Sequence, residues 1–195
     1  LTAFSPASRY EMMRNKPAPI IVITSRDGLI APSITLHFLS TKNAQVTEVH
    51  QFDSFDGSLS DSGALSIEVD LASVNTAIDI RNSRMQEMLF NVAEFAKATF
   101  VADLPATLTD LENGDVVVAK VDGILTLHGK AVPTTFAIKA SKLDDDTMTV
   151  STVSPTLIKA EAFGLTEGVE ALQKIAGLKS ITTTVPVTFS VTFTR

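Results

Sequence analysis

The stretch that decides the fold is Gly123-Ile-Leu-Thr-Leu-His-Gly-Lys-Ala-Val-Pro-Thr-Thr-Phe-Ala-Ile-Lys139. It predicts an antiparallel hairpin, with strands over residues 124–128 and 132–139 and a turn at Gly129 and Lys130. Glycine accepts the positive φ that tight hairpin turns require. In both strands the side chains alternate between two different faces. Hairpins as long as this one favour a barrel or a deep sandwich.

Alternating patterns elsewhere predict more strands. The clearest covers residues 65–71, where apolar and polar residues alternate without a break. Further strands are expected at residues 20–24, 34–42, 46–52, 97–103, 116–120, 148–152 and 183–194. A single wide sheet buries its apolar face on itself only by closing. The sequence therefore predicts a mainly β chain, with an antiparallel β-barrel favoured over a sandwich.

Two segments change to the helical period, so the barrel is expected to carry two short helices. The first lies within residues 73–91, where Asn75 or Thr76 can cap the helix and Ile80 and Met85 fall on one apolar stripe. The second covers residues 161–178, with Gly177 placed to end it.

The composition excludes several classes of function. The chain has 195 residues, and without repeats or linkers we assign residues 1–195 to a single domain. The absence of cysteine excludes disulfides, thiol catalysis and thiolate metal sites. A net charge of −6 argues against nucleic acid as a partner. No apolar run approaches the ~18 residues of a membrane helix, so the apolar side chains are expected to face an interior.

The three histidines do not predict a metal site. Their spacing brings no pair together, and we interpret them as isolated polar residues at the outer surface or the mouth of the barrel. A contact between His128 and a polar head group is the alternative for that residue. The other two are His37 and His50.

Other polar residues have a structural interpretation as well. Arg81 and Arg84 can meet a charged or carbonyl head group, but a solvated or salt-bridged helix face is preferred. The three aspartates at residues 144–146 predict a hairpin tip and lack the further ligands of a calcium loop. No nucleophile elbow or phosphate loop is present, so we expect no enzyme, no metal and no required cofactor.

Four stretches carry the motifs of a known family. They are Phe38-Leu-Ser-Thr-Lys-Asn43 with Glu48-Val-His-Gln-Phe52, Ile67-Glu-Val-Asp-Leu-Ala-Ser-Val-Asn-Thr76 with Ile80-Arg-Asn-Ser-Arg-Met85, Ala98-Thr-Phe100 with Gly123-Ile-Leu-Thr-Leu-His-Gly129, and Phe163-Gly-Leu-Thr-Glu-Gly-Val-Glu-Ala-Leu172 with Val185-Pro-Val-Thr-Phe189. By their order and spacing the chain resembles the YceI-like family of lipid- or polyisoprenoid-binding barrels over residues 33–195. Residues 1–32 depart from it, because the usual aromatic opening is missing.

The resemblance implies an extended antiparallel β-barrel of lipocalin-like form. It also implies an elongated pocket that holds a polyisoprenoid, such as a quinone tail, in a periplasmic or secreted protein. No signal-like segment precedes the barrel, which fits a mature chain. Burying one CH₂ is worth about 0.8 kcal/mol, so a carrier must enclose such a tail in a dry cavity. The residues expected to line that cavity are Leu65, Ile67, Val69, Phe100, Leu125, Leu127, Phe136, Ile138, Val187, Phe189 and Val191.

Three functions fit these observations in decreasing order. The first is the binding, storage or transport of an isoprenoid lipid or a similar long apolar amphiphile. The second is a structural or partner-binding barrel with a filled interior, which predicts an exposed apolar patch. The third is an enzyme acting on a small amphiphile, which predicts a polar cluster inside the cavity. The sequence leaves open the identity of the ligand and whether two chains pair as a homodimer.

Overall fold

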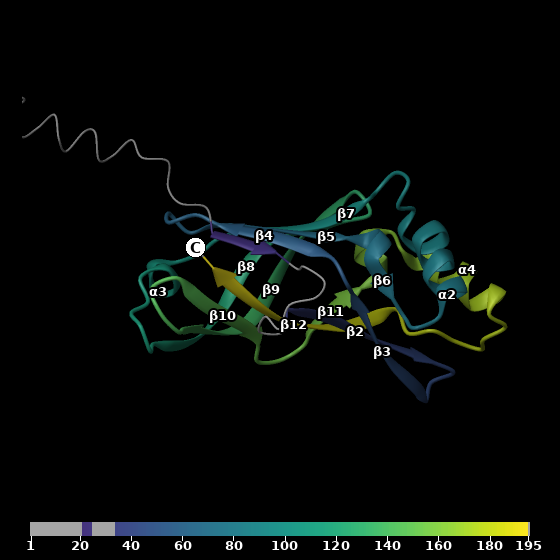
Figure 1. The fold of residues 1–195 in the computed structure, drawn as a ribbon. Coiled ribbons are helices and arrows are strands. Elements are labelled where there is room, and N and C mark those ends of the chain that lie inside the picture. The colour runs from purple at the N-terminus through teal and green to yellow at the C-terminus, as the bar shows by residue number, and fades with distance from the viewer. Residues whose placement is uncertain (1–20, 25–33, 195) are drawn as a thin grey trace, which may run out of the picture.

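The computed structural model describes residues 21–24 and 34–194, which form one antiparallel sheet curled into a barrel with short helices at its ends (Figure 1). The strands are β1 (Ile21–Thr24), β2 (Thr35–Lys42), β3 (Val46–Phe52), β4 (Phe55–Leu59), β5 (Ala64–Asp70), β6 (Val74–Asn75), β7 (Lys97–Asp103), β8 (Val116–Leu127), β9 (Lys130–Lys142), β10 (Thr147–Thr152), β11 (Thr156–Lys159) and β12 (Thr184–Thr194). The helices are η1 (Leu71–Ser73), α2 (Asp79–Arg84), η2 (Met85–Phe90), α3 (Ala106–Thr109), η3 (Ala160–Phe163) and α4 (Thr166–Ile175). The predicted mainly β barrel is confirmed.

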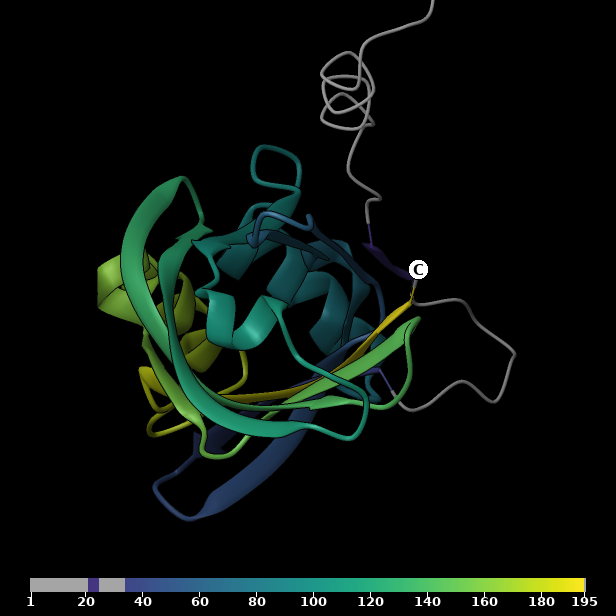
Figure 2. The ribbon, with the colours of Figure 1, turned by 90° about the vertical axis from the view of Figure 1, so that its left-hand side faces the viewer.

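The strands form a closed circuit. Their order is β1-β4-β5-β7-β8-β9-β10-β12-β2-β3-β6, and β1 pairs with β4 and also with β12, through Val22 and Thr194. Beyond β12 the wall continues through β2 and β3, and β3 leads into β4 across Asp53 and Ser54. Viewed from the α3 end, the sheet curls around an interior (Figure 2).

The β8–β9 hairpin is longer than predicted and turns one residue earlier. Its ladder runs without interruption from Val116 paired with Ser141 to Leu127 paired with Lys130. The turn residues are therefore His128 and Gly129, with φ of 52° and 72°. Positive φ at both central positions is the geometry of a type I′ turn, which fits the twist of the strands. The prediction missed it because histidine seldom adopts this conformation.

Gly123 lies inside β8 and permits a close approach to β7. A Cβ at this position would collide with the ring of Phe100 and the carbonyl oxygen of Val101. The sequence predicts separate strands at residues 116–120 and 124–128, whereas in the structure they form one continuous strand. A glycine inside a strand therefore marks a close contact here and not a break.

The first predicted helix is shorter than its segment and changes type. It begins as α2 and continues as the π-helix η2, so a stripe with a period of 3.6 residues does not persist. Met85 is buried, but Ile80 is 58% exposed, and its expected place on the apolar stripe is wrong. Thr76 does not cap the helix; its N–H and hydroxyl instead donate to the side-chain oxygen of Asn82, over 2.9 and 2.6 Å.

The second predicted helix is divided at Gly164, which has φ of 66° and separates η3 from α4. Phe163 and Val169 are buried on its inner side. Gly177 follows its end with φ of 64°, as predicted. Within the described ranges, none of the helices combines the length and apolar composition needed to cross a membrane. Apart from the break at Gly164 and Leu165, the predicted helix is present as η3 and α4.

The core follows the long axis of the barrel in more than one cluster. Leu108 of α3 packs into a cluster with Phe136 and Phe193. Met85 and Phe90 of η2 pack into another. In Figure 1, α3 lies at one end of the barrel and α2, which continues into η2, lies at the other. The two clusters therefore include side chains from opposite ends of the barrel.

Candidate ligand-binding cavity

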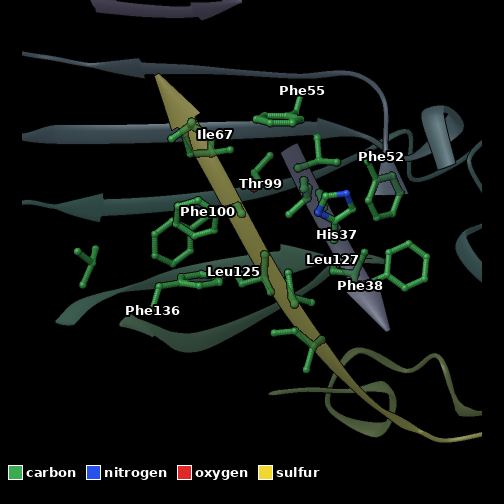
Figure 3. Close-up of a pocket in the computed structure, with 18 of the residues that line it drawn as sticks. His37, Phe38, Phe52, Phe55, Ile67, Thr99, Phe100, Leu125, Leu127 and Phe136 are labelled. Carbon is green, nitrogen blue, oxygen red and sulfur yellow. The ribbon is translucent and has the colours of Figure 1, made fainter. Parts of the chain in front are cut away.

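The barrel interior holds a cavity of about 260 Å³ (Figure 3). Its wall includes Leu108 of α3 at one end and Phe90 of η2 at the other, so the cavity extends along the barrel. This volume is close to the lower end of the range typical of small-molecule sites. The interior is therefore hollow, and the geometry argues against a barrel filled by its own side chains.

The cavity wall is almost entirely apolar. Among the described residues that line it, only His37 and Thr99 have polar side-chain atoms. On β2, His37 lies between the lining residues Leu36 and Phe38, and Thr99 lies between two lining residues of β7 in the same way. Since neighbouring residues of a strand face opposite sides, the inward side of both strands is apolar. Such a surface suits a hydrocarbon guest.

The structure brings every predicted lining residue together at this cavity. They come from β5, β7, β8, β9 and β12. That these residues contact a ligand stays a prediction. The residues are Leu65, Ile67, Val69, Phe100, Leu125, Leu127, Phe136, Ile138, Val187, Phe189 and Val191.

The predicted set does not include every lining residue, and most of the missing ones lie outside those strands. At the start of β2, the alternation of Leu36 and Phe38 with polar residues carried the signal that was needed. The helices and loops have no comparable local signal, because their inward face depends on where they dock. Lining residues that were missed include Leu36, Phe38, Phe52, Phe55, Leu59, Leu71, Met85, Leu89, Phe90, Leu104, Leu108, Ile158, Leu165 and Val169.

Phenylalanine rings form two groups on the wall. In one, Phe136 contacts Phe100 at a centroid distance of 5.0 Å and Phe189 at 5.5 Å, both edge-on. In the other, the ring of Phe52 is 5.4 Å from that of Phe38 and 5.9 Å from that of Phe90. Such ring pairs add about 0.5–1.5 kcal/mol beyond the burial of area. They help to fix the shape of the wall at two places.

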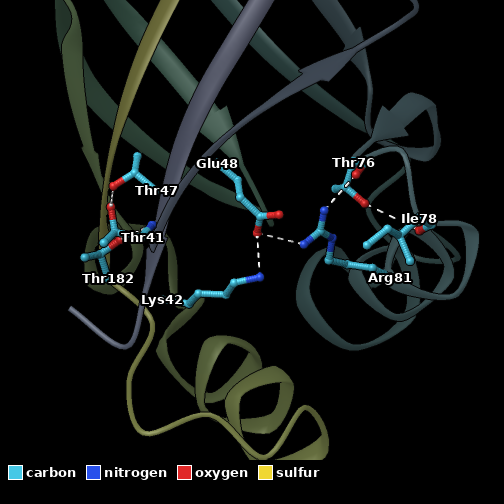
Figure 4. A network of polar contacts seen from close by, with 8 residues as sticks. All are labelled: Thr41, Lys42, Thr47, Glu48, Thr76, Ile78, Arg81 and Thr182. Atoms are coloured by element: carbon cyan, nitrogen blue, oxygen red, sulfur yellow. Dashed lines mark hydrogen bonds and ion pairs between the residues drawn. The ribbon is translucent and has the colours of Figure 1, made fainter. Parts of the chain in front are cut away.

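A polar cluster, made of Lys42, Glu48, His50 and Arg81, lies beside the second group of rings. The carboxylate of Glu48 accepts from Lys42 Nζ at 3.0 Å and from Arg81 Nη1 at 2.9 Å (Figure 4). Arg81 Nη2 donates to the carbonyl oxygen of Thr76 at 2.7 Å. The hydrogen bond from Lys42 is the main cause that lowers the pKa of Glu48, with help from Arg81 and against the effect of burial. Arg81 is thus salt-bridged.

His50 is the buried member of this polar cluster. It is only 5% exposed, with its ring edge-on to Phe38 at 5.4 Å. Burial is the main cause that lowers the pKa of His50, and the charge of Arg81 acts in the same direction. The prediction of a surface position was wrong for His50, because on β3 it shares the inward side with Phe52, whereas Val49 is exposed.

The remaining polar candidates lie elsewhere. His128 is in the β8–β9 turn, where its Nδ1 is 3.3 Å from the carbonyl oxygen of Phe163 and its ring packs on Phe95 at 4.6 Å. Residues 144–146 form the tip between β9 and β10, as predicted. Over residues 21–24 and 34–194 no three side chains of histidine, aspartate or glutamate converge as metal ligands.

Comparisons with known proteins agree with this geometry. A structure described as a polyisoprenoid binding domain from Saccharophagus degradans, implicated in plant cell wall breakdown, is 32% identical over 91% of this chain and 99% of its own, with a TM-score of 0.83. BcnA of Burkholderia cenocepacia shares the fold at 21% identity, with 82% of this chain and 95% of its own covered and a TM-score of 0.62. The YceI protein of Campylobacter jejuni shares it at 15% identity, with 87% and 94% covered and a TM-score of 0.56.

No curated protein sequence matches the chain. The family model described as the YceI-like domain matches residues 32–193, nearly the whole range over which the sequence motifs recur. The motifs, the curled antiparallel sheet and this match agree, and the chain belongs to the YceI-like family.

Proposed function

We propose that this protein binds an isoprenoid lipid, or a similar long apolar amphiphile, inside the barrel and stores or carries it. The observation that carries the proposal is the elongated cavity, whose wall is apolar from α3 to η2. The description of the Saccharophagus degradans relative as a polyisoprenoid binding domain supports the same class of ligand.

The physical chemistry of the cavity favours such a guest. At about 0.8 kcal/mol for each buried carbon, an isoprene unit of five carbons gains up to about 4 kcal/mol on leaving water. Because the described wall is almost entirely apolar, a hydrocarbon that covers it deprives few polar wall atoms of a hydrogen-bond partner. A periplasmic or secreted location follows only from the family resemblance and is part of the proposal.

The two other functions fit the geometry less well. A filled barrel conflicts with the cavity, although Val116 and Val118 on the outer side of β8 are 61% and 66% exposed. An enzyme requires reactive groups that line its substrate site, and the wall of this cavity is almost entirely hydrocarbon. Binding therefore remains the function that the site supports best.

Extraction of the purified protein tests the proposal. The chain is produced in a bacterium that makes isoprenoids, extracted with organic solvent and analysed by mass spectrometry, with a long apolar molecule expected in about equal amount to the protein. Ala98→Phe places a ring at a buried wall position and should reduce the yield severalfold, whereas Val118→Phe, on the exposed side of β8, should not. Extracts that repeatedly contain no lipid would contradict the proposal.

A further inference from the structure

We propose that the polar cluster of Lys42, Glu48, His50 and Arg81 binds the polar head of the amphiphile, and that this head is uncharged and presents an oxygen atom. The proposal rests on the function proposed above and deepens it, because it names which head group the cavity accepts and where that head lies.

Two buried nitrogens of the polar cluster carry the inference. Among the atoms of the described residues, His50 Nδ1 and Arg81 Nε are buried without a hydrogen-bond partner. Native proteins pair nearly all buried polar atoms with protein, water or a ligand, so each exception calls for an occupant. The two residues interact electrostatically and share the neighbour Glu48, which places both nitrogens in one region.

That region adjoins the end of the cavity. His50 is paired across the β2–β3 ladder with Phe38, and their rings are in contact. Phe38 and Phe52 line the cavity, and Phe52 is the next residue on the inward side of β3. Arg81 belongs to α2, which continues directly into η2 and its lining residue Met85. A guest that extends along the cavity therefore has its end beside the polar cluster.

The hydrogen-bonding capacity of Arg81 argues for a small head. Its two terminal nitrogens are already engaged, Nη1 by Glu48 and Nη2 by the carbonyl oxygen of Thr76. Among the described residues, Nε is the guanidinium nitrogen left without a partner. A phosphate held by the paired contact of two guanidinium nitrogens would have to share Nη1 or Nη2 with a group that already accepts from it. One oxygen atom, from a hydroxyl or a carbonyl group, satisfies the Nε–H.

The charges of the polar cluster lead to the same conclusion. Lys42 and Arg81 are positive and Glu48 is negative, so the ion pairs leave a single net positive charge. Burial keeps the imidazole of His50 neutral near pH 7, so its Nδ1 can donate to a carbonyl or accept from a hydroxyl. A diphosphate would bring several negative charges to a site with one positive charge to spare. A neutral head group needs no positive charge to balance it.

Binding of three probes to delipidated protein tests the assignment. The probes share one tail and differ in the head: farnesol, farnesyl diphosphate and the hydrocarbon farnesene. Wild-type protein should bind farnesol about five- to tenfold more tightly than farnesene, the gain of one good hydrogen bond. His50→Leu and Arg81→Lys should each remove most of this preference and leave the affinity for farnesene unchanged.

Conservative and matched variants separate head-group binding from general damage. His50→Asn keeps a hydrogen-bonding group near the position of Nδ1 and should retain much of the preference for farnesol. Val49→Thr, at an exposed neighbour on β3, and Arg84→Lys, on the same helix as Arg81, should retain all of it. All variants are compared at equal folded fraction, measured by circular dichroism.

The outcomes distinguish this inference from the proposed function. Equal affinities for farnesol and farnesene would mean that a trapped water alone satisfies the two nitrogens, and would overturn the head-group site while the carrier function stands. Tighter binding of farnesyl diphosphate than of farnesol would overturn the uncharged head. Failure of all three probes to bind would overturn the carrier function and the head-group site with it.

Discussion

The ring of Phe38, which lines the cavity, meets the ring of His50 edge-on at a centroid distance of 5.4 Å. One side of this contact is a hydrocarbon wall, and the other is the most buried titratable group of the polar cluster. Protonation of His50 would place a charge against that wall and beside Arg81 and Lys42, with Glu48 as the opposing charge among the described residues.

Stability is therefore expected to fall as the solution becomes mildly acidic. The pKa of His50 is lowered in the folded protein, so below about pH 6.5 the unfolded chain binds a proton that the folded chain does not. The stabilisation is complete above that pH and is lost as the pH falls toward the folded pKa. Urea unfolding at pH 7.5 and 5.5 measures it, and His50→Leu should reduce the difference. An unchanged difference in the variant would assign the pH dependence to other groups.

The same substitution should stabilise the delipidated protein at pH 7. His50 Nδ1 is buried without a partner among the described residues, and removing such a group relieves a cost of about 1–3 kcal/mol. We expect His50→Leu to raise the free energy of unfolding by about 1 kcal/mol in urea titrations, with Val49→Thr as the control. A large loss of stability would show that His50 makes an essential structural contact.

Gly168→Ala should destabilise the protein although alanine favours helices. A Cβ at Gly168 of α4 would lie 2.8 Å from the carbonyl oxygen of Met88 and 3.0 Å from the Cα of Leu89, both backbone atoms of η2. Overpacking of this kind costs about 1–3 kcal/mol, more than the gain in propensity. Thermal unfolding should show a lower melting temperature for Gly168→Ala. Glu170→Ala, on the exposed side of α4, should change the melting temperature little. Equal stability of both variants would contradict the tight docking of α4 on η2.

Phe136→Ala should lower the free energy of unfolding by more than any substitution at the surface does. Its ring is 9% exposed and joins Phe100 and Phe189 on the cavity wall. Loss of a buried phenylalanine costs about 3–5 kcal/mol, which includes the enlargement of the cavity. The free energy of unfolding from urea titrations checks this, with the exposed Val118→Ala expected to stay within about 0.5 kcal/mol of wild type. A loss below about 1 kcal/mol would indicate that the wall collapses into the vacated space.

The sequence predicted the parts of this structure that depend on local alternation. On β5, Leu65, Ile67 and Val69 alternate with polar residues, and the inward side could be read without knowing the fold. The same alternation, applied to the other strands, predicted residues that all face the cavity in the structure. A strand has only two sides, so one apolar series decides the orientation of the whole element.

The parts that were missed depend on tertiary contacts. The sequence neighbours of His50 are Val49 and Gln51, and they do not predict that His50 is buried. Its burial becomes clear only from its contact with Phe38. The switch from α2 to η2 has no local signal, since a π-turn is decided by what the helix packs against. The positive φ of His128 is likewise imposed by the hairpin twist. The sequence pattern alone therefore could not predict the polar cluster or the turn.

The hydrogen-bonded circuit through β1 and β12 bears on the proposed carrier function. Backbone ladders maintain the shell, so its form does not depend on what it contains. We therefore expect the barrel to stay folded without a ligand. Under the proposed carrier function, one molecule could then take up and release ligand repeatedly without refolding.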